Sequence, residues 1–312
     1  MPTPHRIRRF LAAPFARRPF VLQWLQWPNP LRAPFTRREI ALHRPGELGD
    51  VVMCLAVVRA IRERNPAARI TFITNYHAFL AGHPLLDRVI SEETARQEQV
   101  RDVISLRYEV FIPLRLHAID YLAGCVGLTN ISHKIPLPDF TPELGNLASE
   151  LPVARPRVVV CRSSGPHTPN KDWPTERWDE LIGRLSSRAT VIELGATPPP
   201  ARAQGSSTDL RGRTTMRQFC AVIAQADLVV TPVTSAVHIA AAYDVPTLAI
   251  VSGYESPEVS AYPRCTALYH AVPCAPCWLR EPCPVGLKCL RGITVEQVTA
   301  AAEKILRATR PA

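Results

Sequence analysis

Apolar residues along the chain recur at two spacings, one typical of strands and the other typical of helices. A short strand is expected over residues 39–44, and a loop over 45–49 follows it. A helix is expected over 50–64, because apolar side chains recur at positions 51, 54, 55, 58 and 61. Further strands are expected over 69–73 and 108–112. The first part of the chain is therefore expected to alternate strand and helix.

A second run of the same kind follows a proline-rich stretch over 135–156, which we interpret as an inter-domain linker. Its strands are expected at 158–161, 189–194, 227–231 and 246–251, and its helices at 174–185, 214–225, 234–243 and 294–307. Such alternation predicts an α/β fold with parallel sheets covered by helices on both faces. We expect two units, 39–150 and 151–312, with ligands at the carboxyl ends of the strands in a cleft between them.

Charge separates the first 38 residues from the rest. The 312-residue chain has a net charge of +10, and residues 1–38 hold eight arginines, several Phe and Trp side chains and no acid. Arginine with interfacial aromatics is typical of a segment lying on an anionic membrane surface, which we favour here. A featureless leader and a nucleic-acid arm are the alternatives, although no nucleic-acid partner is expected. No apolar run approaches the roughly 20 residues of a membrane span, which excludes an integral membrane protein.

The turn over residues 44–50 joins the first expected strand to its helix. Gly46 and Gly49 let the backbone approach a ligand closely, and the helix start offers unpaired N–H groups. The spacing is neither the dinucleotide fingerprint nor a phosphate-binding P-loop. Asp50 is either a cap of the helix or a functional carboxylate facing the cleft.

Two further turns in the second unit carry candidate chemistry. Lys171, one of only four lysines, lies just before a helix, where a cation and the helix dipole together bind phosphate; an exposed lysine is the alternative. In the other turn, Thr234 or Ser235 caps a helix, and His238 lies in its first turn, where the local field disfavours a charged imidazole. A capped helix with a satisfied histidine is the alternative there.

Four segments in this order resemble glycosyltransferase family 9, the ADP-heptose:lipopolysaccharide heptosyltransferases. They are residues 44–52, 171–178, 209–215 and 234–242, and the resemblance covers about residues 39–309. It implies the GT-B architecture, in which two Rossmann-like domains with parallel sheets face a cleft. The N-terminal domain would bind the acceptor and the C-terminal domain the nucleotide sugar. The resemblance further implies an inverting transfer that requires no metal cofactor.

The resemblance also implies roles for single residues. Asp50 matches the general base, Lys171 the lysine that holds the donor pyrophosphate, and Thr234, Ser235 and His238 the helix start lining the donor site. The implied function is transfer of a sugar, heptose above all, from an ADP-sugar to a lipopolysaccharide-type or other lipid-linked glycan. The implied location is cytoplasmic, peripheral on the inner face of the cytoplasmic membrane.

Two positions differ from the family pattern. Val233 replaces an aspartate, and the prolines at 198–200 stand where a ribose-binding glutamate is common. They keep two alternatives open: a related transferase with another nucleotide-sugar donor, and a catalytically silent GT-B protein that binds a nucleotide or glycan.

The nine cysteines form two groups. One group is scattered among apolar residues and is expected in the core: Cys54, Cys125, Cys161, Cys220 and Cys265. The other is a cluster: Cys274, Cys277, Cys283 and Cys289. Its first pair has the spacing of a metal knuckle, but the second pair does not match. The cluster is a candidate structural zinc or iron site, with packing thiols or disulfides as alternatives.

Overall fold

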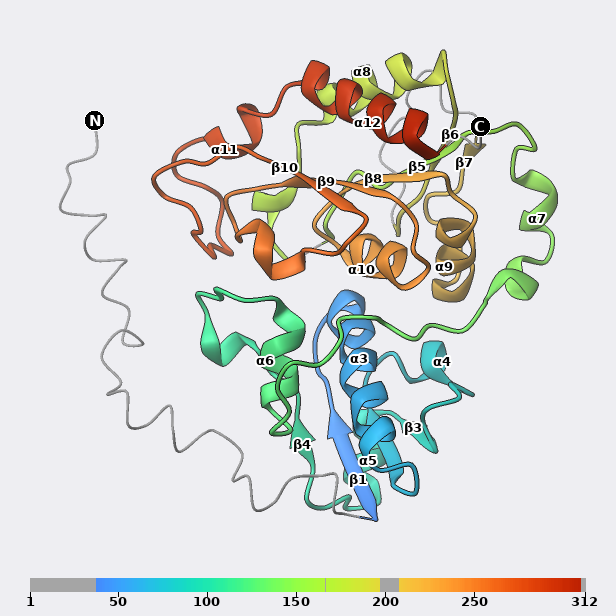
Figure 1. Ribbon diagram of the computed structural model, residues 1–312, viewed down its shortest axis with the longest axis vertical. Coiled ribbons are helices and arrows are strands. Elements are labelled where there is room, and N and C mark those ends of the chain that lie inside the picture. Colours follow the sequence, from blue (N-terminus) through green and yellow to red (C-terminus); the bar gives the residue numbers. More distant parts are fainter. Residues whose placement is uncertain (1–37, 166, 197–207, 310–312) are drawn as a thin grey trace.

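The computed structural model describes residues 38–165, 167–196 and 208–309. The expected arm, apart from Arg38, and the prolines at 198–200 lie outside these residues. The described chain forms two parallel sheets, each in its own half of the molecule, and helices α3 and α10 face each other between them (Figure 1).

The first sheet, with four strands in the described part of the chain, has the order β3-β2-β1-β4. Its strands are β1 (Glu39–His43), β2 (Arg69–Ile73), β3 (Arg88–Ile90) and β4 (Ile104–Ser105). Strands β1 and β2 pair in parallel register, so that Ile40 opposes Ile70 and Leu42 opposes Phe72. These four side chains are buried, because alternate residues of a strand point to the same face.

The second sheet, six-stranded over the described residues, has the order β10-β9-β8-β5-β6-β7. Its strands are β5 (Arg157–Val160), β6 (Thr190–Glu193), β7 (Thr208–Asp209), β8 (Leu228–Pro232), β9 (Thr247–Val251) and β10 (Cys265–Tyr269). The α/β fold class with parallel sheets is confirmed.

Helices connect the strands in both halves. The α-helices are α3 (Leu48–Arg64), α4 (His77–Leu80), α5 (Glu92–Gln97), α6 (Ala118–Gly124), α7 (Leu147–Glu150), α8 (Thr175–Ser186), α9 (Met216–Ala224), α10 (Ser235–Ala242), α11 (Lys288–Arg291) and α12 (Val295–Thr309). Short 3-10 helices are η4 (Glu109–Phe111), η5 (Thr141–Leu144), η6 (Pro169–Lys171) and η7 (Pro257–Ser260). None of the helices in the described ranges is long and apolar enough to cross a membrane.

The two faces of the second sheet belong to different cores. Val158 and Val160 of β5 pack with α8 and α12, whereas Val159 between them belongs to a core that continues into the first half. This division follows from the two-residue period of a strand. The larger core therefore joins the two halves through α3, α9 and α10.

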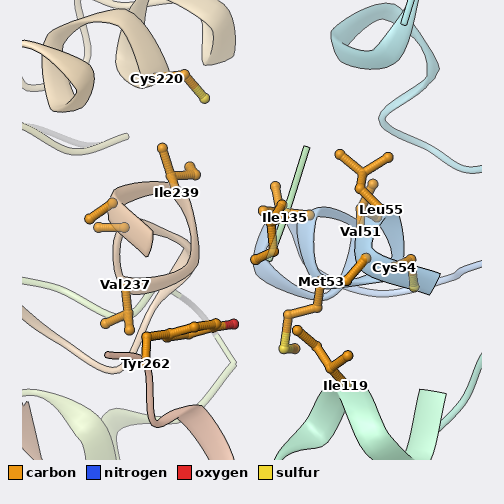
Figure 2. Packing of buried hydrophobic residues seen from close by; sticks show 14 of the residues in the cluster. Val51, Met53, Cys54, Leu55, Ile119, Ile135, Cys220, Val237, Ile239 and Tyr262 are labelled. Carbon is orange, nitrogen blue, oxygen red and sulfur yellow. The ribbon is translucent and has the colours of Figure 1, made fainter. Parts of the chain in front are cut away.

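Helix α3 is the centre of that larger core. Its residues from Val51 to Val58 are all buried, because the first sheet, α6 and α10 surround it. In Figure 2, Met53 of α3 meets Ile119 of α6, and Val237 of α10 lies against the ring of Tyr262. The absence of a polar stripe on α3 thus reflects burial on every side.

Two expectations about local structure were wrong. The strand expected over 108–112 is instead a turn containing η4, because Tyr108 and Glu109 bond to the turn after β1 rather than to a neighbouring strand. Helix α3 begins at Leu48, two residues earlier than expected. Within the 135–156 stretch the structure adds two helices, η5 and α7.

Candidate active site

The candidate residues lie at the points where strand order reverses. In the first sheet this point is between β1 and β4, and in the second it is between β5 and β8. Helices leave opposite faces of the sheet at such a point, which opens the crevice where α/β proteins bind ligands. The turn after β1 carries Asp50, the segment after β5 carries Lys171, and the turn after β8 carries Thr234. Topology thus places the three turns that carry the candidate residues at the crevices of their sheets.

Asp50 lies in the first turn of α3 and is held by three donors. Tyr108 donates its hydroxyl to Oδ1 at 2.7 Å, and the Glu47 N–H donates to Oδ2 at 3.2 Å. The Arg44 guanidinium lies 2.8 Å from Oδ2. The side chain is 15% exposed, so the carboxylate is oriented but still reaches solvent. The Glu47 N–H belongs to the capping residue of α3, so the structural and functional interpretations of Asp50 are compatible.

Arg44 is the fully buried cation behind this carboxylate. It donates to the Leu106 carbonyl at 2.8 Å and makes two bonds to the Glu109 carboxylate at 2.8 and 3.0 Å. Burial lowers its pKa, but Asp50 and then Glu109 outweigh burial and raise it, so the guanidinium stays charged. Burial, and then Asp50, raise the pKa of Tyr108 well above its usual value, so the phenol stays a donor.

Gly46 makes room for this arrangement. Its φ of 117° is open to glycine and strained for other residues, and a Cβ there would lie 2.9 Å from Asp50 Oδ2. The expected close approach of the backbone is therefore made to the Arg44–Asp50 pair itself.

Lys171 ends η6 and points at the loop after β9. Its ammonium pairs with Glu255, whose side chain is buried, and lies 4.7 Å from the ring centroid of Tyr254. The lysine side chain is 16% exposed, so the interpretation of Lys171 as an ordinary surface lysine was wrong. An anionic ligand at this position would meet a cation that is already oriented by a carboxylate and an aromatic face.

Helix α10 begins as the sequence suggests. Thr234 is the capping residue and accepts the Ala236 N–H at 3.1 Å, and Ser235 is the first helical residue. His238 is buried, and its Nδ1 lies 2.8 Å from the Tyr262 hydroxyl. Burial lowers the pKa of His238 to about 4, so the imidazole is neutral as expected, although burial rather than the helix field is the main cause.

The two halves meet at Gly49. A Cβ on Gly49 would lie 3.0 Å from His238 Cδ2 and 3.3 Å from Ser235 Cα. Only a glycine in α3 lets α10 approach this closely. The structure thus brings the turn that holds Asp50 against the helix start of the other half, and Asp50 and Lys171 both influence the pKa of His238.

A histidine group beside this contact was missed by the sequence reasoning. His117 stacks on His133 with ring centroids 4.1 Å apart and meets the edge of Tyr262 at 4.8 Å. Ile119 donates its N–H to Nδ1 of His117, and Nε2 of this ring is buried with no hydrogen-bond partner among the described residues. Burial, followed by His133 and His238, lowers the pKa of His117 to about 2. The sequence did not indicate this group, because its histidines are far apart in the chain and show no recognisable spacing.

The cysteine segment is arranged differently from the metal site that its spacing suggested. Within residues 38–165, 167–196 and 208–309, no three His, Cys, Asp or Glu side chains come together in a way that could hold a metal ion. Cys289 is buried against Gly253, and the Cys283 sulfur accepts the Leu287 N–H at 3.4 Å. The four thiols are unpaired, so the disulfide alternative is not realised either. As placed, these residues do not fit a zinc or iron ion.

Backbone hydrogen bonds hold the segment instead. Asn170 donates its amide to the Leu279 and Glu281 carbonyls at 2.8 and 2.7 Å and accepts the Cys283 N–H at 2.9 Å. The segment thereby braces the loop that ends at Lys171. In the scattered group, Cys54, Cys161 and Cys220 are buried as expected, and Cys125 and Cys265 are half-buried.

Comparison with known proteins gives a consistent result. The sequence model of a family described as glycosyltransferase family 9 (heptosyltransferase) matches residues 83–281. No curated protein matches the chain.

Solved structures with the same fold are similar over most of the chain. The glycosyltransferase family 9 protein from Veillonella parvula DSM 2008 has 17% identity and a TM-score of 0.66, covering 87% of this chain and 97% of that one. The E. coli ADP-heptose lipopolysaccharide heptosyltransferase II has 16% identity and a TM-score of 0.65, covering 86% and 99%. TibC, a dodecameric iron-containing heptosyltransferase from enterotoxigenic E. coli in complex with ADP-D-β-D-heptose, has 14% identity and a TM-score of 0.69, covering 88% and 77%. The two parallel sheets thus have the GT-B arrangement of these structures.

Proposed function

The chain belongs to glycosyltransferase family 9 and is a glycosyltransferase, and from this we propose that it transfers heptose from an ADP-sugar to a lipid-linked glycan of the lipopolysaccharide type. The observation that carries the proposal is the contact at Gly49, which brings the Asp50 turn against the start of α10. In such a transfer the acceptor oxygen must lie close to the anomeric carbon of the donor while the base hydrogen-bonds to that oxygen, so the base and the donor site have to be neighbours.

Asp50 is the proposed general base. An acceptor hydroxyl that attacks the anomeric carbon loses its proton, and a carboxylate within hydrogen-bond reach accepts it. The Glu47 N–H and Arg44 both contact Oδ2 of Asp50. In contrast, Oδ1 accepts one bond, from Tyr108, and a carboxylate oxygen can accept a second. In the proposal the acceptor hydroxyl donates that second bond. Attack from the face opposite the leaving ADP inverts the anomeric centre.

Lys171 and the start of α10 form the proposed donor site. Negative charge grows on the ADP oxygen as the glycosidic bond breaks, and a cation that meets this charge lowers the barrier. Lys171 provides the cation, and the Ser235 N–H lies at the positive end of α10. In this assignment residues 39–150 bind the acceptor and residues 151–312 bind the donor.

Val233 favours a second candidate. It is a buried apolar residue directly before the α10 cap, at the position where the family carries a carboxylate. A donor sugar that relies on a hydrogen bond there would lose it, so a different nucleotide-sugar donor is the second candidate for the same site. Under either candidate the protein must transfer sugar, so binding of the nucleotide without transfer would contradict both.

The test is a donor screen combined with one substitution. Release of nucleotide is measured with a panel of ADP-, UDP- and GDP-sugars in the presence of a lipid-linked glycan, and ADP binding is measured by calorimetry. Asp50→Asn should lower transfer by at least about 100-fold and leave ADP binding unchanged. Asp244→Asn is the matched control, because Asp244 is exposed and its left-handed backbone suits asparagine.

The outcomes separate the candidates. Transfer from ADP-heptose supports the proposal, transfer from another donor supports the second candidate, and ADP binding without transfer supports the silent protein. An Asp50→Asn variant with the rate of Asp244→Asn would remove Asp50 as the base.

A further inference from the structure

The loop between β4 and α6, residues 107–116, has two chemically different sides. Its inner side holds the candidate base, since Tyr108 bonds to Asp50 and Glu109 bonds to Arg44. Its outer side exposes apolar residues: Val110 is 55% exposed, Ile112 37% and Leu116 58%. In Figure 1 this segment runs out beside α6, at the margin of the first half.

This apolar group is unusual for the molecule. Among the described residues, seven large hydrophobic side chains are exposed, and three of them lie within this one loop. Single exposed apolar residues are ordinary, whereas several side by side mark a surface that is covered by something else. The loop is therefore a candidate docking surface.

Charge indicates the chemistry of the occupant that would fit this surface. Arg107 and Arg115 are exposed on the same loop, and the one acid of the loop, Glu109, is already paired with buried Arg44. Among the described residues neither arginine has an ion-pair partner, so the outer side is apolar with two cations. Apolar side chains flanked by arginine match a bilayer with anionic headgroups, in which the apolar groups enter the interface and the cations meet phosphate.

The two occupants available from the chain itself fit less well. The 1–38 arm carries eight arginines and no acid, so it repels Arg107 and Arg115. A second copy would place the same two arginines against each other in a two-fold contact. Of these three occupants, the anionic bilayer is the one that supplies the opposite charge.

We propose that residues 107–116 dock the enzyme on an anionic lipid surface, with Val110, Ile112 and Leu116 in the interface and Arg107 and Arg115 on the headgroups. This inference rests on the proposed function, since it brings a lipid-linked acceptor to the loop that holds Asp50. It adds a second lipid contact to the one expected of the arm, and this contact lies at the site.

The test is co-sedimentation of the full chain with vesicles of phosphatidylcholine alone or mixed with phosphatidylglycerol. Val110→Asp combined with Leu116→Asp should weaken binding to the anionic vesicles by about 20-fold, at about fivefold for each half-exposed side chain. Val153→Asp is the matched control, because Val153 is 90% exposed and lies far along the chain from the loop. Its binding should equal that of the unchanged protein.

A second variant guards against a folding defect. Arg107→Gln combined with Arg115→Gln leaves the apolar residues in place and should weaken binding by roughly tenfold or more at low salt, with no change on neutral vesicles. ADP binding, measured on each variant, should stay constant. Failure of the proposed donor or acceptor would leave these sedimentation results unaffected, so the two proposals fail separately.

Three results would overturn the docking proposal. One is equal vesicle binding by the loop variants and Val153→Asp, which would assign all lipid binding to the arm. Another is equal binding of the unchanged protein to neutral and anionic vesicles. The third is a dimer in light scattering that the Val110→Asp, Leu116→Asp protein no longer forms while its vesicle binding persists, which would make the loop a contact between copies.

Discussion

Replacing Gly49 by alanine tests whether the contact between the two halves controls transfer. The added Cβ would lie 3.0 Å from His238 Cδ2, 3.3 Å from Ser235 Cα and 3.4 Å from Ser235 N. Two of these atoms are backbone, and the third belongs to an imidazole held by the Tyr262 hydroxyl. The methyl group is therefore accommodated only if α10 moves by a few tenths of an ångström.

The effect on the free energy of unfolding and the effect on the transfer rate are expected to be of comparable size. Overpacking of this kind costs about 1–3 kcal/mol, and alanine in place of a helical glycine returns up to about 1 kcal/mol. The free energy of unfolding should thus fall by roughly 0–3 kcal/mol. Displacement of the donor-side helix relative to Asp50 should lower transfer about threefold to tenfold, because reaction rates depend steeply on alignment.

Gly183→Ala is the matched control for this prediction. Gly183 lies within α8, and a Cβ there would meet no atom within 4 Å. This variant should gain about 0.5–1 kcal/mol of stability and keep the full transfer rate. Thermal unfolding and initial rates measured on both variants decide the matter. If Gly49→Ala were as stable and as fast as Gly183→Ala, the close approach of α10 to α3 would not contribute to transfer.

Three further predictions concern the charged and hydrogen-bonding groups of the site. Lys171→Ala should weaken ADP binding about 100-fold in calorimetry, and Glu255→Gln, which frees the ammonium, should strengthen it; equal affinities in all three proteins would exclude Lys171 from the donor site. Tyr108→Phe removes the 2.7 Å bond to Asp50 and should lower kcat about tenfold with the affinity for ADP unchanged, whereas a loss of affinity alone would contradict a role on the acceptor side. The pKa of His238 is about 4 in the folded protein and 6.5 in the unfolded chain. Between these two pH values the imidazole binds a proton only when the protein unfolds. The free energy of unfolding therefore falls as the pH drops from 6.5 to 4, by about 1.4 kcal/mol per pH unit from this group. Urea unfolding at several pH values should show a shallower fall for His238→Asn, and parallel curves for the two proteins would contradict the assignment.

Much of the fold could be predicted from local spacing. The run of buried residues at 51, 54, 55, 58 and 61 identifies α3, and continuous apolar runs identify the buried strands β8 and β9. Short elements such as β4 and α6 were not predicted, because a few residues do not complete a period. The strand expected over 108–112 is instead a loop on whose surface Val110 and Ile112 are exposed.

The candidate site divides in the same way. The sequence alone places the candidate residues at turns between a strand and a helix, since Gly46, Lys171 and Thr234 precede a helix and Asp50 lies in the first turn of one. Hydrogen bonds within a few residues, such as the Thr234 cap, depend on local order alone. These features can be predicted without knowledge of the fold.

Only the tertiary structure decided what these residues contact. Tyr108 meets Asp50 across 58 positions, and Glu109 meets Arg44 across 65, because strand order places β4 beside β1. The same holds for Lys171 with Glu255 and for Gly49 with His238, which belong to different halves or loops. These contacts join residues that are far apart in the sequence. Local sequence patterns are compatible with many such pairings, and the packing of the core determines which one forms. The metal interpretation of the cysteines failed for this reason: their spacing is local, whereas the bonds that position the segment come from Asn170, more than a hundred residues away.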